Sequence, residues 1–181
     1  MNLDERLEQV VLLDDQGRTT GSMDKLEVHR KGLLHRAFSI FLFNEAGHLL
    51  LQQRAATKYH SAALWTNTCC GHPRPGEIPE AAAKRRLFEE LGIRCELDRK
   101  FEFLYQADVG NGLIEHELDA VYFGRFDGTV QADPSEVSAT RWMRMNDLAD
   151  DLSTSPQRYT EWLKVCWPRV LDFFRREQLR A

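Results

Sequence analysis

The sequence lacks the features that mark membrane-spanning and exported proteins. None of its apolar runs reaches the about 18 residues that a membrane-spanning helix needs. Its start, Met1 to Arg6, is polar and acidic, so we expect no signal peptide. Its 181 residues fit one domain, and 43% hydrophobic with 29% charged residues is a normal globular balance. We therefore expect a cytoplasmic protein that does not enter a membrane.

Cysteine is scarce and follows no framework. The four cysteines are Cys69, Cys70, Cys95 and Cys166. Cys69 and Cys70 are adjacent and cannot readily pair with each other, and no Cys-x-x-Cys spacing indicates a structural zinc site. Free thiols are the expected state in a chain without an export signal.

An excess of positive charge is also missing. The net charge is −4, which argues against a general nucleic-acid surface. If the substrate is an anion, the positive groups that bind it must be gathered locally.

The pattern along the chain alternates strands with few helices. Pro79 suits a first helical position, and Gly92 suits the end, which predicts a helix between them. Ser155 is the expected cap of a last helix, from near Pro156 to about Arg176, whose apolar face holds Trp162, Val165, Cys166, Val170 and Phe173. The expected strands are 10–13, 36–43, 48–54, 65–71, 101–109, 113–126 and 140–145, with hairpin turns at 44–47 and 110–112 and a loop over 25–35. This order predicts one layered domain of the α/β (α+β) class.

A spaced motif begins at Gly71. Five residues separate Gly71 from Glu77, seven separate Glu77 from Arg85, and the chain continues as Arg86-Leu87-Phe88-Glu89-Glu90-Leu91-Gly92-Ile93. This resembles the Nudix box, G-x5-E-x7-R-E-U-x-E-E-x-G-U, in which U is aliphatic. The resemblance implies a Nudix-type mixed sheet sandwiched by helices, with residues 1–181 as a single catalytic domain that has an N-terminal strand extension and a C-terminal helix.

Arg86 departs from the box, which has a glutamate at that position. A cation there removes a metal ligand of hydrolytic Nudix enzymes and suits phosphate binding instead. Glu89 and Glu90 point about 100° apart on a helix, so they cannot face one spot equally. Glu90 either pairs with Arg86 on a solvated face or binds Mg²⁺, and within a matched box we favour the ligand role.

A second motif precedes the box. The segment Trp65-Thr66-Asn67-Thr68-Cys69-Cys70-Gly71-His72-Pro73 resembles the W-T-N-x-x-C-G-H-P segment of type I isopentenyl diphosphate isomerases. The resemblance runs from about Val10 to Trp162. It implies an enzyme that moves the double bond of isopentenyl diphosphate to give dimethylallyl diphosphate, in isoprenoid biosynthesis.

Two pairs of these residues share a face if their segments are extended. Cys70 and His72 are two apart, and so are Glu115 and Glu117. Imidazoles with carboxylates suit a borderline transition metal. The resemblance implies one Mn²⁺ or Zn²⁺ ion held by His29, His35, His72, Glu115 and Glu117. His48, His60 and His116 match no ligand position of the family.

The resemblance also implies catalytic and substrate-binding roles. Cys70 and Glu117 are the expected acid/base pair, Tyr105 is expected to hydrogen-bond Glu117 or the thiol site, and Trp162 is expected to stabilise a carbocation. Glu90 and the backbone carbonyl of Cys70 are expected to hold one Mg²⁺ with the diphosphate. The diphosphate-binding residues are expected to be Lys25, Arg54, Lys58 and Arg86.

Alternatives stay open at this point. The protein could be a Nudix diphosphohydrolase, or a metal- or phosphate-binding module without turnover. The sequence leaves open Mn²⁺ against Zn²⁺, the order of the proton steps, and a monomer against a small homo-oligomer.

Overall fold

The structure is a computed structural model that describes residues 8–178; the start from Met1 to Arg6 lies outside the described residues. No helix within 8–178 is long and apolar enough to cross a membrane. The strands are β1 (Gln9–Leu13), β2 (Thr19–Asp24), β3 (His35–Phe43), β4 (Leu49–Arg54), β5 (Trp65–Thr66), β6 (Cys69–Gly71), β7 (Leu97–Asp108), β8 (Ile114–Arg125) and β9 (Val137–Met143). The helices are α1 (Lys25–Lys31), α2 (Pro79–Leu91), α3 (Met145–Thr154), the short 3₁₀ helix η2 (Pro156–Arg158) and α4 (Glu161–Gln178).

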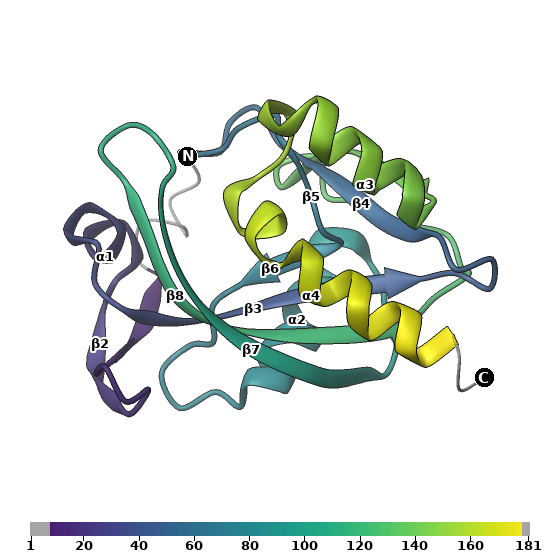
Figure 1. Ribbon diagram of the computed structural model, residues 1–181. Helices are drawn as coiled ribbons and strands as arrows, with labels where there is room; N and C mark the ends of the chain where they lie inside the picture. Colours follow the sequence, from purple (N-terminus) through teal and green to yellow (C-terminus); the bar gives the residue numbers. More distant parts are fainter. Residues whose placement is uncertain (1–7, 179–181) are drawn as a thin grey trace.

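The strands form one mixed sheet around β3 (Figure 1). β3 pairs in parallel with β8 along its whole length, and antiparallel with β1, β4 and β6. β7 and β8 form the long hairpin that the turn at 110–112 predicts. β3 is almost entirely buried, as expected for a strand that is covered on both faces.

Helices cover both faces of the sheet. Phe41 and Phe43 of β3 pack into a core with α3 and α4, whereas Phe38, Ile40 and Leu42 pack into a core with α2. Side chains of a strand alternate between faces, so β3 supplies both cores. The predicted α/β class, with a mixed sheet between helices, is confirmed.

Helix α2 begins and ends where the sequence predicts. Pro79 occupies the first turn, and Gly92 adopts the left-handed conformation with φ 66° after the last turn. A side chain is disfavoured at that φ, so glycine is the natural residue to end the helix.

The predicted loop over residues 25–35 is wrong, because Lys25–Lys31 form α1. The Asp24 side chain accepts a hydrogen bond from the backbone N–H of Glu27 at 3.0 Å, which caps the helix. Gly32 ends it in the left-handed conformation. An Asp followed by Glu three residues later is a capping signal that the sequence contained.

The predicted strand over residues 65–71 is instead two short strands. β3 and β4 pair only at Phe43 and Leu49, so they diverge, and β5 joins β4 while β6 joins β3. Thr68 fills the gap between them: its hydroxyl donates to the carbonyl of Leu50 and accepts from the N–H of Leu42. Side-chain hydrogen bonds thus replace a ladder that one straight strand would supply.

The last helix starts later than predicted, at Glu161, and Ser155 makes no side-chain cap. Thr160 donates its backbone N–H to the carbonyl of Trp65, which holds this segment against β5 in a non-helical conformation. The predicted apolar face is mostly buried, but Val165 is 49% exposed. Strand β2 and helix α3 were not predicted, and β7 and β9 begin earlier than expected.

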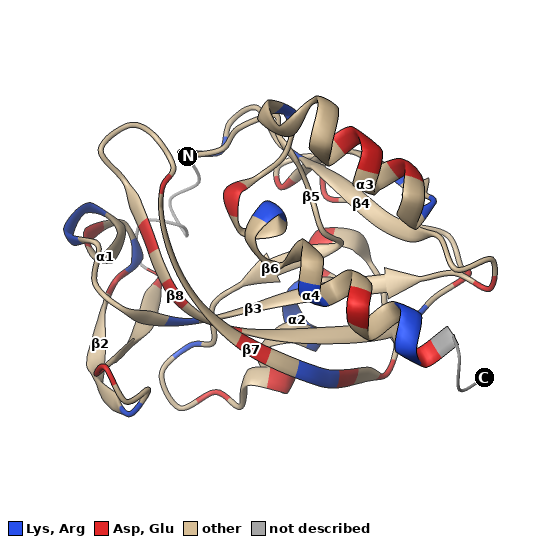
Figure 2. Ribbon diagram, in the orientation of Figure 1, with Lys and Arg blue, Asp and Glu red and all other residues tan. Residues whose placement is uncertain are grey.

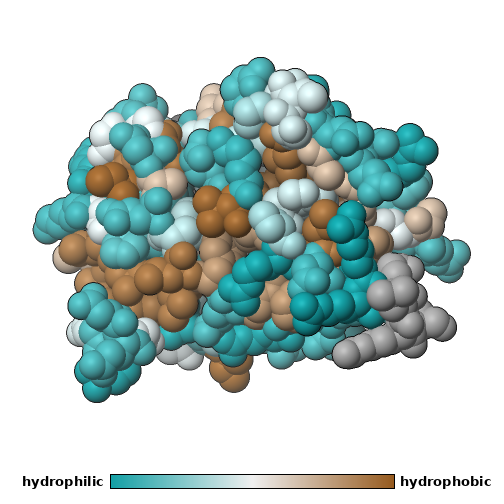
Figure 3. Space-filling model, in the orientation of Figure 1, coloured by the Kyte–Doolittle hydropathy of each residue, from teal (hydrophilic) through white to brown (hydrophobic). Residues whose placement is uncertain are grey.

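Charged residues of both signs are spread along the chain. Acidic and basic residues are interspersed along the ribbon in Figure 2. On the face shown in Figure 3, apolar patches are interrupted by polar ones. Positive charge for an anionic ligand must therefore come from a local site.

Candidate active site

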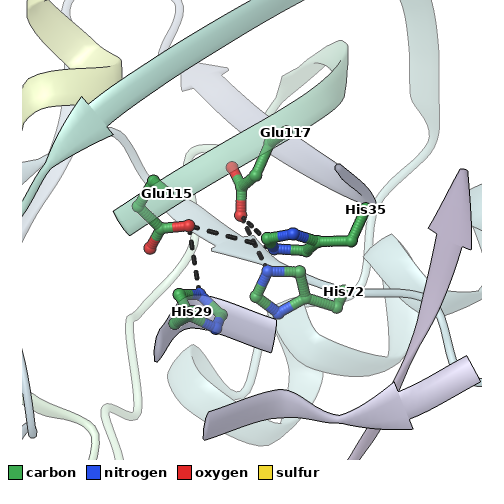
Figure 4. Close-up of side chains that lie close together, drawn as sticks. All are labelled: His29, His35, His72, Glu115 and Glu117. Atoms are coloured by element: carbon green, nitrogen blue, oxygen red, sulfur yellow. Dashed lines mark hydrogen bonds and ion pairs between the residues drawn. The ribbon is translucent and has the colours of Figure 1, made fainter. Parts of the chain in front are cut away.

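The five predicted metal ligands meet in one buried cluster (Figure 4). Their candidate ligand atoms all lie within 4.8 Å of one another. The cluster draws on segments far apart in the chain, namely α1, the start of β3, the residue after β6, and β8. Its members are His29, His35, His72, Glu115 and Glu117.

Backbone pairing explains this convergence. The parallel register of β3 and β8 sets His35 opposite Glu117. Glu115 and Glu117 are both buried because alternate residues of β8 face the same side of the sheet. Helix α1 adds His29, which is fully buried.

Hydrogen bonds to the backbone orient two of the imidazoles. Nδ1 of His29 lies 2.6 Å from the carbonyl of Lys25, and Nδ1 of His35 lies 2.8 Å from the carbonyl of Leu33. Since a carbonyl only accepts, each Nδ1 carries the proton and each Nε2 presents a lone pair.

These lone pairs face carboxylate oxygens, which are acceptors themselves: Nε2 of His29 lies 3.1 Å from Glu115, and Nε2 of His35 lies 3.3 Å from Glu117. Nε2 of His29, Nε2 of His35 and Oε2 of Glu115 are buried and have no hydrogen-bond partner within residues 8–178. Buried polar atoms are normally paired. The set therefore fits a divalent metal ion, which neutral imidazoles and carboxylates bind.

Burial tunes the charges of the cluster. It lowers the pKa of His29, and it lowers the pKa of His72 to about 4 against the opposing charge of Glu117, so both rings are neutral at neutral pH. Burial and the charge of Glu117 raise the pKa of Glu115. Burial opposes ionisation of Glu117 too, but the neighbouring His72 and His35 rings hold its pKa well below the usual range.

Glu117 belongs to the buried histidine and carboxylate cluster and also lines a pocket. Its Oε1 is 2.8 Å from Nε2 of His72, and its Oε2 accepts a hydrogen bond from the Tyr105 hydroxyl at 2.5 Å. Tyr105 thus contacts the carboxylate, one of the two partners considered from the sequence. Cys70 lines the same pocket, and burial raises the pKa of its thiol to about 12.

Trp162 forms part of the wall of this pocket. Its indole N–H donates to the side-chain oxygen of Asn67 at 3.1 Å, which fixes the ring. The guanidinium of Arg54 lies 5.3 Å from the ring centre. The Trp162 ring therefore lines the pocket and already contacts one cation, the guanidinium of Arg54.

The predicted diphosphate-binding cations line the same pocket, and each has an acceptor in the structure. Lys25 pairs with Glu8 at 3.0 Å, and Lys58 pairs with Glu136. Arg86 lies 3.2 Å from Glu136, and Arg54 donates to backbone carbonyls. The pocket thus gathers four cations, three of which contact carboxylates that also line it.

Glu90 is buried, whereas the neighbouring Glu89 is exposed. One oxygen of Glu90 accepts from Arg86 at 2.6 Å, and the other accepts from Gln52 at 3.0 Å. The pairing with Arg86 is present, but the alternative of a solvated helix face is wrong for Glu90. Cys70 and Glu90 line the same pocket.

The pocket contains residues that sequence reasoning missed. Asp119 continues the inward-facing row of Glu115 and Glu117, is 1% exposed, and accepts from Ser39 at 2.7 Å. The period of two along β8 was a signal for it. His60 lies in a loop that no periodicity describes, and only the tertiary structure brings it to the site. Other missed lining residues are Glu8, Ser39, Gln52, Tyr59 and Glu136.

The chain is similar to known proteins over most of its length. The NUDIX domain model matches residues 33–163. The isopentenyl-diphosphate Delta-isomerase 1 of Aromatoleum aromaticum is 51% identical over 91% of this chain and 93% of its own length. The isopentenyl-diphosphate Delta-isomerase of Pectobacterium atrosepticum is 46% identical over 96% of this chain and 99% of its own.

A solved structure supports the fold. The crystal structure of DR0079 from Deinococcus radiodurans superposes with a TM-score of 0.76 at 20% identity, over 90% of this chain and 98% of that one. At this identity the similarity shows the shared fold alone.

Proposed function

Because the chain belongs to the isopentenyl-diphosphate Delta-isomerase family, within the Nudix superfamily, we propose that it converts isopentenyl diphosphate to dimethylallyl diphosphate. The observation that carries the proposal is one pocket lined by a thiol, a carboxylate of the metal cluster, an indole and four cations. Residues before the matched region belong to the site as well: Lys25 of α1 lines this pocket, and His29 of α1 lies in the histidine cluster. The catalytic unit therefore extends beyond residues 33–163.

The reaction needs two acid/base groups. A proton is added to the terminal alkene carbon, and a different proton is removed from the carbon next to the oxygen-bearing one, so the double bond moves by one position and the diphosphate stays intact. Cys70 and Glu117 line the pocket and are the proposed pair. Tyr105 holds the Glu117 carboxylate from the side away from His72.

The charge between the two proton transfers needs an aromatic face. Proton addition leaves a tertiary carbocation, and a desolvated cation over an indole gains about 2 kcal/mol. Trp162 is 3% exposed and is fixed by Asn67, so it presents this face without rearrangement. Water must also be excluded from this pocket during the reaction, since it would capture the cation as an alcohol.

The diphosphate is proposed to bind Lys25, Arg54, Lys58 and Arg86. In the structure the carboxylates of Glu8 and Glu136 contact three of these cations, and a diphosphate would compete with them for the same donors. Glu90 and the backbone carbonyl of Cys70 are proposed to hold one Mg²⁺ beside the diphosphate. Since Mg²⁺ prefers few carboxylates together with phosphate oxygens, one buried glutamate suits it.

The histidine cluster is proposed to hold one Mn²⁺ or Zn²⁺ ion. When bound, that ion supplies a positive charge beside Glu117. The protein residues do the rest: the carbonyls of Lys25 and Leu33 orient His29 and His35, and Tyr105 orients the free oxygen of Glu117. We propose that the protein is located in the cytoplasm, where its free cysteines would stay reduced.

A nuclear magnetic resonance experiment in D2O tests the function. The isomerase incorporates deuterium into the carbon skeleton of isopentenyl diphosphate and leaves the diphosphate intact. A Nudix hydrolase instead releases phosphate or a monophosphate, and a binding module leaves the substrate unchanged. Either of those two results would overturn the proposal.

A further inference from the structure

His60 is a buried histidine outside the predicted ligand set. It is 5% exposed and lies in the loop between β4 and β5. Its Nε2 is 3.2 Å from Oε1 of Glu115, whereas Oε2 of Glu115 is the oxygen that faces His29, at 3.1 Å. The two oxygens of this carboxylate thus have different neighbours, one in the metal cluster and one in the loop.

The other side of the His60 ring is also held. Its Nδ1 lies 3.2 Å from the Ser61 hydroxyl, which can donate to it. With the hydroxyl as donor, the ring proton lies on Nε2, which faces the acceptor oxygen of Glu115. The ring stacks on His29 with centroids 5.7 Å apart and meets the edge of Trp162 at 6.1 Å.

The loop that carries His60 has a strained backbone, and hydrogen bonds from Arg54 hold it in place. Ser61 and Ala63 have φ values of 47° and 60°, which residues with a Cβ rarely adopt. Such conformations persist only where neighbouring contacts hold them, and they gather at functional sites. Here Arg54 donates to the carbonyls of His60 and Ser61, so one loop connects Glu115 with a proposed diphosphate-binding arginine.

We propose that His60 is a positioning residue for the metal cluster: its Nε2–H holds Oε1 of Glu115, so that Oε2 stays directed at the ion. A ligand carboxylate whose second oxygen is hydrogen-bonded cannot rotate away, and residues that orient metal ligands in this way typically contribute about 10- to 100-fold in metal affinity. This inference rests on the metal site of the proposed function, but it can be measured without turnover.

Two amide substitutions separate the hydrogen bond from packing. In His60→Gln the amide nitrogen replaces Nε2 and can still reach Glu115. In His60→Asn the shorter amide replaces Nδ1 and cannot reach it. Both variants place an amide in the same buried site, so each is the matched control for the other. His48→Gln, at a half-buried histidine that does not line this pocket, controls for histidine loss alone.

Metal affinity is measured on the metal-free proteins by competition between Mn²⁺ binding and a chelator. We expect His60→Asn to bind Mn²⁺ about 10- to 100-fold more weakly, with His60→Gln closer to the wild type. We also expect the kcat of His60→Asn to recover at saturating Mn²⁺. Equal losses in the two variants, or none in either, would overturn the proposal. If the wild type binds the metal but does not isomerise, the proposed function fails while this inference stands.

A measurement without mutation keeps the inference testable if a variant does not fold. Nitrogen-15 shifts of histidine in the Zn²⁺-loaded wild type report which ring nitrogen carries the proton. We expect His60 to be protonated on Nε2 alone. A proton on Nδ1 alone would leave no donor toward Glu115 and would rule the role out.

Discussion

The two halves of strand β8 share one face of the sheet but differ in chemistry. In the first half, Glu115, Glu117 and Asp119 are buried, and in the second half Val121 and Phe123 take the same inward positions. The apolar half packs with α3 and α4. The acidic half meets histidines, a tyrosine and a serine instead.

The apolar half of β8 contributes to the stability of the fold, whereas the acidic half lowers it. Burying an apolar side chain is favourable by itself, whereas a buried carboxylate must find partners. Burial and the charge of Glu117 raise the pKa of Asp119, so crowded acids are held together at a cost. We expect substitutions in the acidic half to change activity first, and substitutions in the apolar half to change stability first.

The largest expected effect is on turnover. Glu117→Gln and Cys70→Ala each remove one of the proposed acid/base groups. We therefore expect each substitution to lower kcat by about 10²- to 10⁴-fold. Isomerisation assays with matched circular dichroism spectra measure this. His116→Gln, on the opposite face of β8, is the control that keeps its activity. Near wild-type turnover in either site variant would reject the acid/base assignment.

Metal removal comes next. A chelator should abolish activity and lower the melting temperature, because an ion at about 100 times its Kd adds about 2.7 kcal/mol to the stability of the folded state. His29→Ala and His72→Ala should lower the content of the first metal in elemental analysis. Unchanged stoichiometry in both variants would contradict the ligand set.

In the apolar half, Phe123→Leu should reduce the free energy of unfolding by about 1 to 3 kcal/mol, since Phe123 packs with Phe41 and Phe43. Urea unfolding measures the loss. The kcat of the folded fraction should stay at the wild-type value. If Phe123→Leu instead lowered kcat and left the free energy of unfolding unchanged, the expected difference between the two halves of β8 would be wrong.

The smallest effect concerns Tyr159, a tyrosine in the core that includes Phe123. Burial and the hydrogen bond to Asp151 raise its pKa to about 12. A tyrosine in the unfolded chain ionises near about pH 10, so this group stabilises the fold fully below that pH and loses its contribution as pH rises toward 12. Tyr159→Phe should flatten this part of the stability curve in urea titrations. An unchanged pH dependence would show that Tyr159 does not titrate there.

Local patterns predicted the parts of the fold that depend on neighbouring residues. Helix α2 follows from Pro79 and Gly92, and the hairpin of β7 and β8 follows from its turn. The start of α4 could not be predicted, because the contact of Thr160 with Trp65 lies far away in sequence. The split of residues 65–71 likewise depends on the divergence of β3 and β4.

The motif at Gly71 and the segment before it indicated the family, the period of two predicted that Glu115 and Glu117 share a face, and the resemblance implied the five proposed metal ligands, because all of these depend on residue types at fixed separations. Only the tertiary structure decided that His60 meets Glu115, that Glu8 reaches Lys25, and that Asp119 joins the site. Those contacts join segments with no common period, so only the packing of the whole sheet brings them together.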